Sequence, residues 1–189
     1  MNEQRGITFI HPSQAFDELA TLAHRGNTLP HIMARVAELA RLAIPGATEA
    51  SVTLLKDQYA CTAAGSGARA LAFDERQYEA GQGPCLEAAW ANIVIRIDET
   101  ATEQRWTDYM QMLFNHGVRS VLSVPMARKA IPVGALNIYS NIPGMFGESN
   151  VELSRTVAEY VWEVLSAVNV LANPDMRMAT EWKAVSIAS

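Results

Sequence analysis

The chain has 189 residues, of which 49% are hydrophobic and 19% are charged, with a net charge of −5 and a pI near 5.4. This length suits one domain, and the apolar content is sufficient to offset the entropy of ordering a core. Lysine and arginine are scattered along the sequence, and nucleic-acid backbones bind basic surfaces, so direct nucleic-acid binding is not expected.

Targeting and metal-binding signals are absent from the sequence pattern. No apolar run reaches the roughly 18 uncharged residues of a membrane span, and the first residues lack a signal-peptide pattern. We therefore expect a cytoplasmic protein with no membrane partner. The two cysteines, Cys61 and Cys85, are too few for a disulfide framework and have no neighbours at metal-ligand spacing, so no metal site is predicted.

Two helices open the predicted fold. Residues 13–25 place apolar residues on one helical face, and Gly26 follows as a stop signal. The second helix begins near Thr28, a candidate N-cap, with Pro30 in its first turn, and ends at Pro45.

A hairpin is predicted next, from strands over residues 48–56 and 58–65. The following stretch, residues 65–82, has a mixed pattern and several glycines. We predict a loop there, with one short helix near residues 74–79.

The pattern becomes regular again after Gly83. It predicts, in chain order, a helix over 84–91, a strand over 93–97, a helix over 103–116, and strands over 118–126 and 133–140. Gly117 suits a left-handed residue at a helix C-terminus. The last two strands are expected to form an antiparallel pair.

The longest predicted element is a helix over residues 149–172. Ser149 and Glu152 have the spacing of a capping box, and apolar residues then recur at helical steps. We expect a domain over residues 13–172 between an N-terminal tail, 1–12, and a C-terminal tail, 173–189.

This order of elements predicts an α+β fold with a central antiparallel sheet. The N- and C-terminal helices are expected on one face of the sheet. Loops and short helices from the middle of the chain would cover the other face and roof a ligand cavity.

Several segments of the chain carry a family resemblance. They are residues 78–88, Asp98, residues 103–106, residues 117–125 and residues 134–140. Over residues 13–172 the chain resembles the GAF domains of actinobacterial GAF-ANTAR regulators. The resemblance implies the GAF fold, small-molecule or redox sensing, and dimerisation through the terminal helices.

In those regulators an RNA-binding ANTAR module of three helices follows the GAF domain. Only 15 residues follow Pro174 here, too few for such a module. We expect either a stand-alone GAF protein or part of a regulator, and no RNA binding by this chain.

Cys85 is the strongest candidate for a chemically reactive side chain. With Gly83 as cap and Pro84 as first helical residue, its thiol would lie in the first turn, where the helix dipole favours a thiolate. Cys85 would then be a redox sensor or a nucleophile, or instead a small buried packing residue. We interpret Cys61 as a structural residue. The sequence alone neither supports nor excludes a disulfide between Cys61 and Cys85.

Free methionine sulfoxide reductases, another GAF-fold group, supply an enzymatic alternative. They also have a cysteine near the start of this helix. Their further cysteine segment corresponds to residues 98–109 here, which contain no cysteine, so a disulfide cycle lacks its second thiol.

Ligand-binding candidates come from the loop, the helix and the strands around the expected cavity. Asp98 would bind a ligand or cap a turn, and Trp106 and Tyr109 would stack on a ligand or pack in the core. Arg119 would face an anionic ligand or solvent. Asn137 and Tyr139 share one strand face and should point toward the cavity.

The sequence favours a sensory GAF domain that transmits ligand or redox state through its terminal helices, in transcriptional or antitermination regulation. The alternatives are a thiol-dependent reductase and a module that serves only for association. The ligand is a small molecule of unknown identity, and no cofactor is indicated. We also expect a homodimer through helices 13–43 and 149–172, because apolar residues such as Leu165 lie off the main stripe of the last helix.

Overall fold

The computed structural model describes residues 10–22, 28–128, 131–169, 180–181 and 183–185. The helices are α1 (Pro12–Leu22), α2 (Leu29–Ala43), α3 (Ala68–Ala80), α4 (Pro84–Ala91), α5 (Thr107–Asn115) and α6 (Glu148–Ala167). The strands are β1 (Glu49–Lys56), β2 (Tyr59–Gly65), β3 (Ile95–Ile97), β4 (Ser120–Arg128), β5 (Ile131–Ser140) and β6 (Lys183–Ala184). Within these residues, no helix is both long and apolar enough to cross a lipid bilayer.

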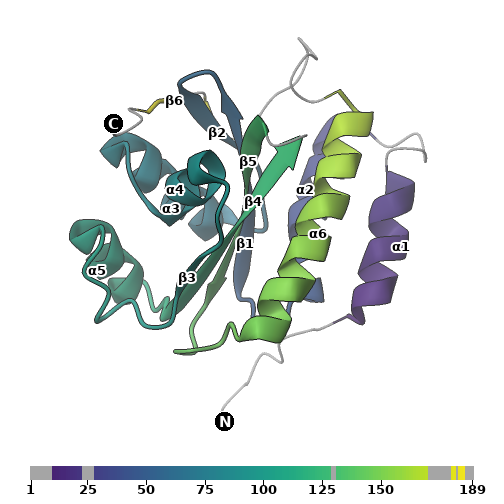
Figure 1. Ribbon diagram of the computed structural model, residues 1–189. Helices are drawn as coiled ribbons and strands as arrows, with labels where there is room; N and C mark the ends of the chain where they lie inside the picture. The colour runs from purple at the N-terminus through teal and green to yellow at the C-terminus, as the bar shows by residue number, and fades with distance from the viewer. Residues whose placement is uncertain (1–9, 23–27, 129–130, 170–179, 182, 186–189) are drawn as a thin grey trace.

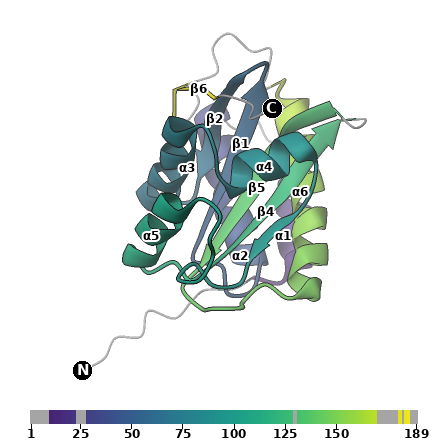
Figure 2. The same ribbon diagram turned by 60° about the vertical axis from the view of Figure 1, so that its left-hand side comes forward.

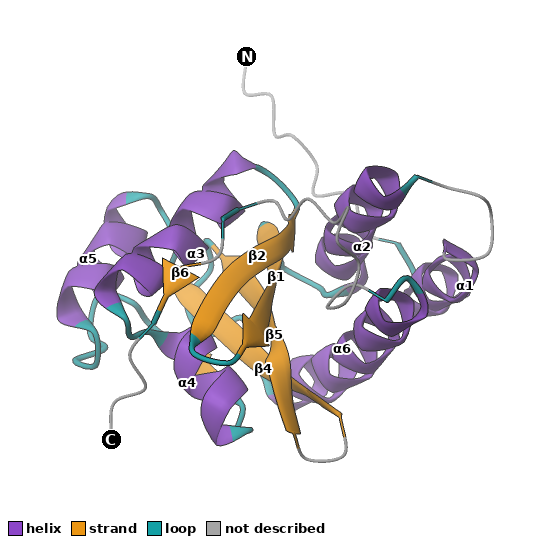
Figure 3. Ribbon diagram, turned by 90° about the horizontal axis from the view of Figure 1, so that it is seen from above, coloured by secondary structure: helices purple, strands orange, loops and turns teal. Residues whose placement is uncertain are grey.

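A single sheet organises the molecule. Its strand order is β3-β4-β5-β1-β2-β6, and all neighbouring strands are antiparallel. Helices α1, α2 and α6 lie on one side, and α3, α4 and α5 lie on the other (Figures 1 and 3). The predicted α+β architecture is therefore confirmed.

Strand alternation gives the sheet two different faces, both buried. In β5, Leu136 and Ile138 join the large apolar core beneath α2 and α6. Asn137 and Tyr139 also have no exposed area, and they point to the opposite face, toward α3. Their predicted orientation is correct.

The helix layer has two tiers. Helices α2 and α6 pack on the sheet, and α1 packs against both of them (Figure 3). The rings of Phe16 in α1 and Tyr160 in α6 stack at a centroid distance of 4.8 Å. Helix α1 therefore gives α6 a second apolar partner besides the sheet.

This arrangement removes the argument for dimerisation through α6. Leu165 is fully buried within the single chain, whereas the exposed positions of α6 include Glu152, Arg155, Glu159 and Glu163. Charged surface of this kind does not need a second subunit to cover it. Homodimerisation through helices 13–43 and 149–172 stays a prediction without this support.

The main difference from the sequence prediction is at residues 65–82, where the short helix predicted near 74–79 is the second half of the longer helix α3 (Figure 2). The buried side of this helix includes Asp74 and Gln77 as well as Phe73 and Tyr78. Polar residues on the inner face hide the apolar period by which an amphipathic helix is recognised.

Smaller differences concern the ends of elements. The helix expected over 103–116 begins at Thr107, and the strand expected over 93–97 is limited to β3. Gly147, and not Ser149, is the N-cap of α6, so the capping box is not formed. The expected tail contains β6, which pairs with β2. The predicted helix ends at 23–25 and 170–172 lie outside the described residues.

Replacing Leu165 with alanine tests the burial of α6. The variant should lose about 3 kcal/mol of unfolding free energy, because it leaves a cavity in the core. As a control, Ile131→Ala, at a side chain that is 66% exposed, should change stability by less than about 0.5 kcal/mol. Urea unfolding measures both. A Leu165→Ala chain of unchanged stability would contradict this packing.

Candidate functional site

A cluster of buried polar side chains fills the space between the sheet and helices α3, α4 and α5. We call it the Asp74 cluster, and its members are Ser51, Thr53, Thr62, Asp74, Gln77, Tyr78, Cys85, Tyr109, Ser123, Asn137 and Tyr139. Tyr109 is 6% exposed, and every other member is at most 1% exposed. Polar groups buried to this degree need hydrogen-bond partners.

Local structure explains how these side chains meet. Ser51 and Thr53 alternate along β1, and residues two apart in a strand share a face. Asp74, Gln77 and Tyr78 lie three and four residues apart on α3, a spacing that places them on one helical face. The strand face and the helix face are directly opposed.

The carboxylate of Asp74 lies at the centre of the cluster. It accepts hydrogen bonds from Thr62 Oγ1 at 2.8 Å and Tyr139 Oη at 2.9 Å, and a longer one from Asn137 Nδ2 at 3.4 Å. Burial raises the pKa of Asp74 to about 6, although the surrounding donors oppose this rise. The donors around this carboxylate are all uncharged.

A second set of hydrogen bonds connects the strands. Tyr78 Oη lies 2.8 Å from Thr53 Oγ1 and 3.0 Å from Thr62 Oγ1. The amide of Asn137 donates to Thr53 at 3.0 Å and accepts a hydrogen bond from Ser123 at 3.0 Å. The side chains of four strands and α3 thus form one network.

Gln77 links this network to the start of α4. Its Oε1 accepts a hydrogen bond from the backbone N–H of Cys85 at 2.9 Å, within the first turn of α4. Gly83 makes this contact possible, because its φ of +155° is unfavourable for other residues and a Cβ there would lie 2.3 Å from Gln77 Oε1.

Two buried polar atoms of the cluster have no hydrogen-bond partner among the described residues. They are Gln77 Nε2 and Tyr109 Oη. The Tyr109 hydroxyl approaches the side chains of Tyr139 and Gln77, but neither approach has the geometry of a full hydrogen bond. Burial, together with the charge of Asp74, raises the pKa of Tyr109 well above the usual range. An unpaired buried donor is destabilising by about 1–3 kcal/mol, so these atoms require an explanation other than stability.

The structure changes the interpretation of both cysteines. Cys85 is fully buried, and its pKa is raised by burial and by the negative charge of Asp74. The thiolate expected from the helix terminus is therefore disfavoured. Cys61 packs in the apolar core on the other face of the sheet, and burial raises its pKa to about 12. Since the two thiols lie on opposite faces, the disulfide considered from sequence is not formed by this fold.

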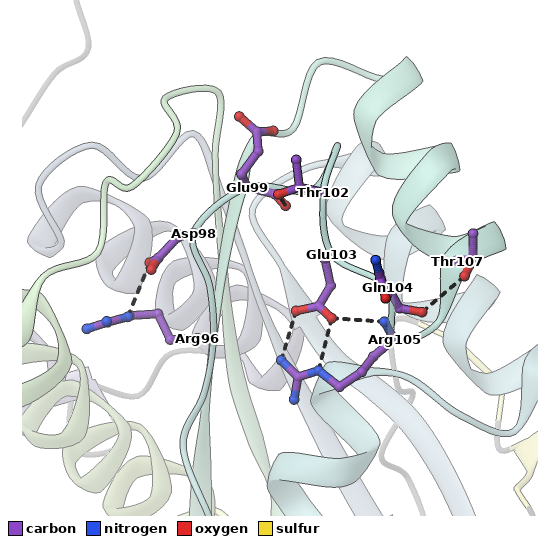
Figure 4. Close-up of polar contacts among 8 residues, drawn as sticks. All are labelled: Arg96, Asp98, Glu99, Thr102, Glu103, Gln104, Arg105 and Thr107. Carbon is purple, nitrogen blue, oxygen red and sulfur yellow. Dashed lines mark hydrogen bonds and ion pairs between the residues drawn. The ribbon is translucent and has the colours of Figure 1, made fainter.

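The other predicted site residues lie outside the cluster. The Asp98 side chain is 63% exposed and pairs with Arg96 at 3.2 Å, in the loop shown in Figure 4. Arg119 pairs with Glu99 at 2.6 Å. Trp106 is half-buried at the N-cap of α5. Of the seven predicted residues, the structure brings together Cys85, Tyr109, Asn137 and Tyr139.

The sheet face toward α3, α4 and α5, where a ligand cavity is expected, holds the buried side chains of the Asp74 cluster. Two hollows lie nearer the surface. One, of about 440 Å³, lies between α3 and α5 and is lined in part by Phe73, Met112 and His116. The other, of about 400 Å³, lies between the end of β4 and α6. No group of three metal-binding side chains occurs within the described residues.

The raised pKa of Asp74 predicts that stability depends on pH. The folded chain holds this proton more tightly than the unfolded chain, whose carboxyl has its ordinary value of 3.8. The stabilisation is therefore fully present below that value and is lost as the pH rises through about 6, which amounts to about 3 kcal/mol.

Urea unfolding of the wild type and of Asp74→Asn measures this effect. Asparagine does not ionise, so the variant should gain stability relative to the wild type between about pH 4 and pH 7. Glu79→Gln, on the exposed side of α3, is the matched control and should show no such gain. A difference that does not vary with pH would contradict a buried, titrating Asp74.

Burial of both thiols predicts slow chemical modification. In the folded chain, iodoacetamide near pH 8 should label neither Cys61 nor Cys85 in the time that fully labels the urea-unfolded chain. Mass spectrometry of peptides measures the labelling of each. Rapid labelling of Cys85 alone would restore the redox interpretation.

Comparison with solved structures places this fold. The chain is similar to the GAF domain of a phosphoenolpyruvate-protein phosphotransferase from Coxiella burnetii, with a TM-score of 0.65 and 14% identity over 86% of this chain and 98% of that one. It is also similar to free methionine-R-sulfoxide reductase from Neisseria meningitidis, solved in complex with its substrate, with a TM-score of 0.64 and 15% identity over 84% and 90% of the two chains. A domain of a putative two-component sensor histidine kinase protein from Sinorhizobium meliloti gives a TM-score of 0.58 and 14% identity over 78% and 97%.

These identities are low and establish the shared fold alone. No curated protein matches the chain. The sequence profile of the GAF domain, however, matches residues 26–166, which include the sheet from β1 to β5 and helices α2 to α6. The chain therefore belongs to the GAF domain family.

Proposed function

We propose that this chain is a sensory GAF domain that binds a small polar molecule at the Asp74 cluster. The helix layer of α1, α2 and α6 would transmit the bound state to a partner protein or module. The segments that resemble GAF-ANTAR regulators support a role in transcriptional or antitermination control. Dimerisation through the terminal helices would suit such a role.

The observation that carries this proposal is the pair of unpartnered atoms, Gln77 Nε2 and Tyr109 Oη. A core selected for stability alone would satisfy these groups or replace them with apolar ones. Both belong to a cluster that already holds a buried carboxylate. A small molecule with matching polar atoms would complete the hydrogen bonding of the cluster.

The surface hollow between α3 and α5 suggests the route of entry. Phe73 lines this hollow, and its ring centroid lies 5.1 Å from that of Tyr139, whose hydroxyl reaches Asp74. A ligand that displaced Phe73 would therefore arrive at the cluster. For a ligand to enter by this route, α5 would move outward. This helix is short and lies at the periphery of the layer (Figure 2).

A binding role agrees with the cysteines better than a reductase role does. Free methionine-R-sulfoxide reductases share the fold with this chain. The chain has two cysteines, however, and they are buried on opposite faces of the sheet. A reductase cycle that proceeds through a disulfide within the chain needs two thiols within reach of each other.

The variant Tyr109→Phe tests the proposal. Removing an unpartnered hydroxyl should leave the free energy of unfolding unchanged or raise it by about 1 kcal/mol. Tyr139→Phe is the matched control and should lower it by about 1–3 kcal/mol, because Asp74 loses a donor. Urea unfolding distinguishes the two tyrosines.

Binding is then measured by thermal shift with a library of small cationic, neutral and anionic polar molecules. At least one compound should raise the melting temperature of the wild type and have a smaller effect on Tyr109→Phe. If no compound does so, the sensory proposal fails. Turnover of free methionine sulfoxide by the wild type would instead favour the reductase alternative.

A further inference from the structure

The charge around Asp74 limits what the cluster can bind. The titratable groups that face this carboxylate are Tyr78 from its own helix, Cys85 from α4, Tyr109 from α5 and Tyr139 from β5. Strands β1 and β2 add the hydroxyl groups of Ser51, Thr53 and Thr62. Within the described chain, no basic side chain bonds to this carboxylate.

The arginine on the same helix that contacts Phe73 makes its hydrogen bond outside the cluster. Arg69 lies on α3, and its guanidinium is 5.7 Å from the centroid of the Phe73 ring. It donates a hydrogen bond to the backbone oxygen of His116 at 2.6 Å, and its side chain is 52% exposed. The carboxylate of Asp74 is therefore a buried anion without a counter-charge, a state that proteins ordinarily avoid.

Aromatic residues make up part of the wall of the cluster that holds this carboxylate. Phe73 and Tyr139 pack at an interplanar angle of 60°, and the hydroxyls of Tyr78 and Tyr109 belong to the same cluster. The face of an aromatic ring attracts a cation. A carboxylate within such a wall favours an ammonium group and repels an anionic one.

The two unpartnered atoms indicate which chemical group the other end of the ligand carries. Gln77 Nε2 is an amide donor, because the Oε1 of the same side chain accepts from the N–H of Cys85. The Nε2 group of Gln77 therefore requires an acceptor atom, and Tyr109 Oη can also donate to such an atom. An oxygen on the ligand would satisfy both donors.

From these contacts we infer that the ligand is a small protonated amine that also carries an oxygen acceptor. The ammonium group pairs with Asp74, and the oxygen accepts from Gln77 and Tyr109. This inference rests on the proposed function, since it names the class of molecule that the proposed site takes.

Three series of probes of equal length test the class of ligand. They are amino alcohols, diols and hydroxy acids with two to six carbons, which carry positive, neutral and negative charge at one end. Calorimetry with the wild type should show at least one amino alcohol that binds about tenfold or more tightly than its diol and its hydroxy acid.

Two variants place the binding at the cluster. Asp74→Asn should remove the preference for the amino alcohol, whereas Glu152→Gln, at an exposed position of α6, should keep it. The affinity of the wild type should also fall about tenfold per pH unit below the pKa of Asp74, about 6.

The outcomes separate this inference from the proposed function. If a diol or a hydroxy acid binds as tightly as the amino alcohol, or if Asp74→Asn keeps the preference, the ligand class is wrong. If no amino alcohol binds while another compound of the library depends on Tyr109, the ligand class is again wrong but the sensory function stands. If nothing binds at all, both fail.

Discussion

Burial of the Asp74 carboxylate against the centre of the sheet is the constraint on which one half of this structure depends. A buried charge must be surrounded by donors, and the donors come from β2 and β5. Thr62, Asn137 and Tyr139 therefore occupy positions that apolar residues would otherwise fill. The result is a sheet with one apolar face and one face on which a polar cluster lies beside two smaller apolar clusters, although helices cover both faces (Figure 3).

The same constraint decides how much of the fold could be predicted from sequence. Helices α2 and α6 and the two hairpins follow an apolar period, and the sequence prediction located them within a few residues. Only residues 74–79 of α3 are predicted as helix, because the inner face of α3 carries Asp74 and Gln77, and a helix of this kind lacks an apolar stripe. Apolar periodicity does not identify a helix whose buried face is polar.

The residues of the candidate site, too, are predicted correctly only where the signal is local. The orientation of Asn137 and Tyr139 followed from strand alternation alone, which is a local property. Asp98 and Arg119 were assigned to the site from their chemical type, but they pair with Arg96 and Glu99 at the surface. The pairing of Arg119 with Glu99, 20 residues away, cannot be derived from one sequence. The alternation of Ser51 and Thr53 in an otherwise apolar strand was the available sign of a polar core face.

The energetics of opening the cluster favour a charged ligand over a neutral one. In the closed state Asp74 accepts two short hydrogen bonds, and each bond to a charged group contributes about 1.5–3 kcal/mol. In an open state Asp74 would lose one or both of these donors. A ligand stabilises the open state only to the extent that it binds the open state more strongly than the closed state. One neutral hydrogen bond contributes about 1 kcal/mol and does not offset the loss of even one of these donors. An ammonium group paired with the desolvated carboxylate can offset it, because the attraction between opposite charges increases as water is excluded. Displacement of Phe73, which packs on Tyr139, would then act on β5, whose other face supports the helix layer through Leu136 and Ile138.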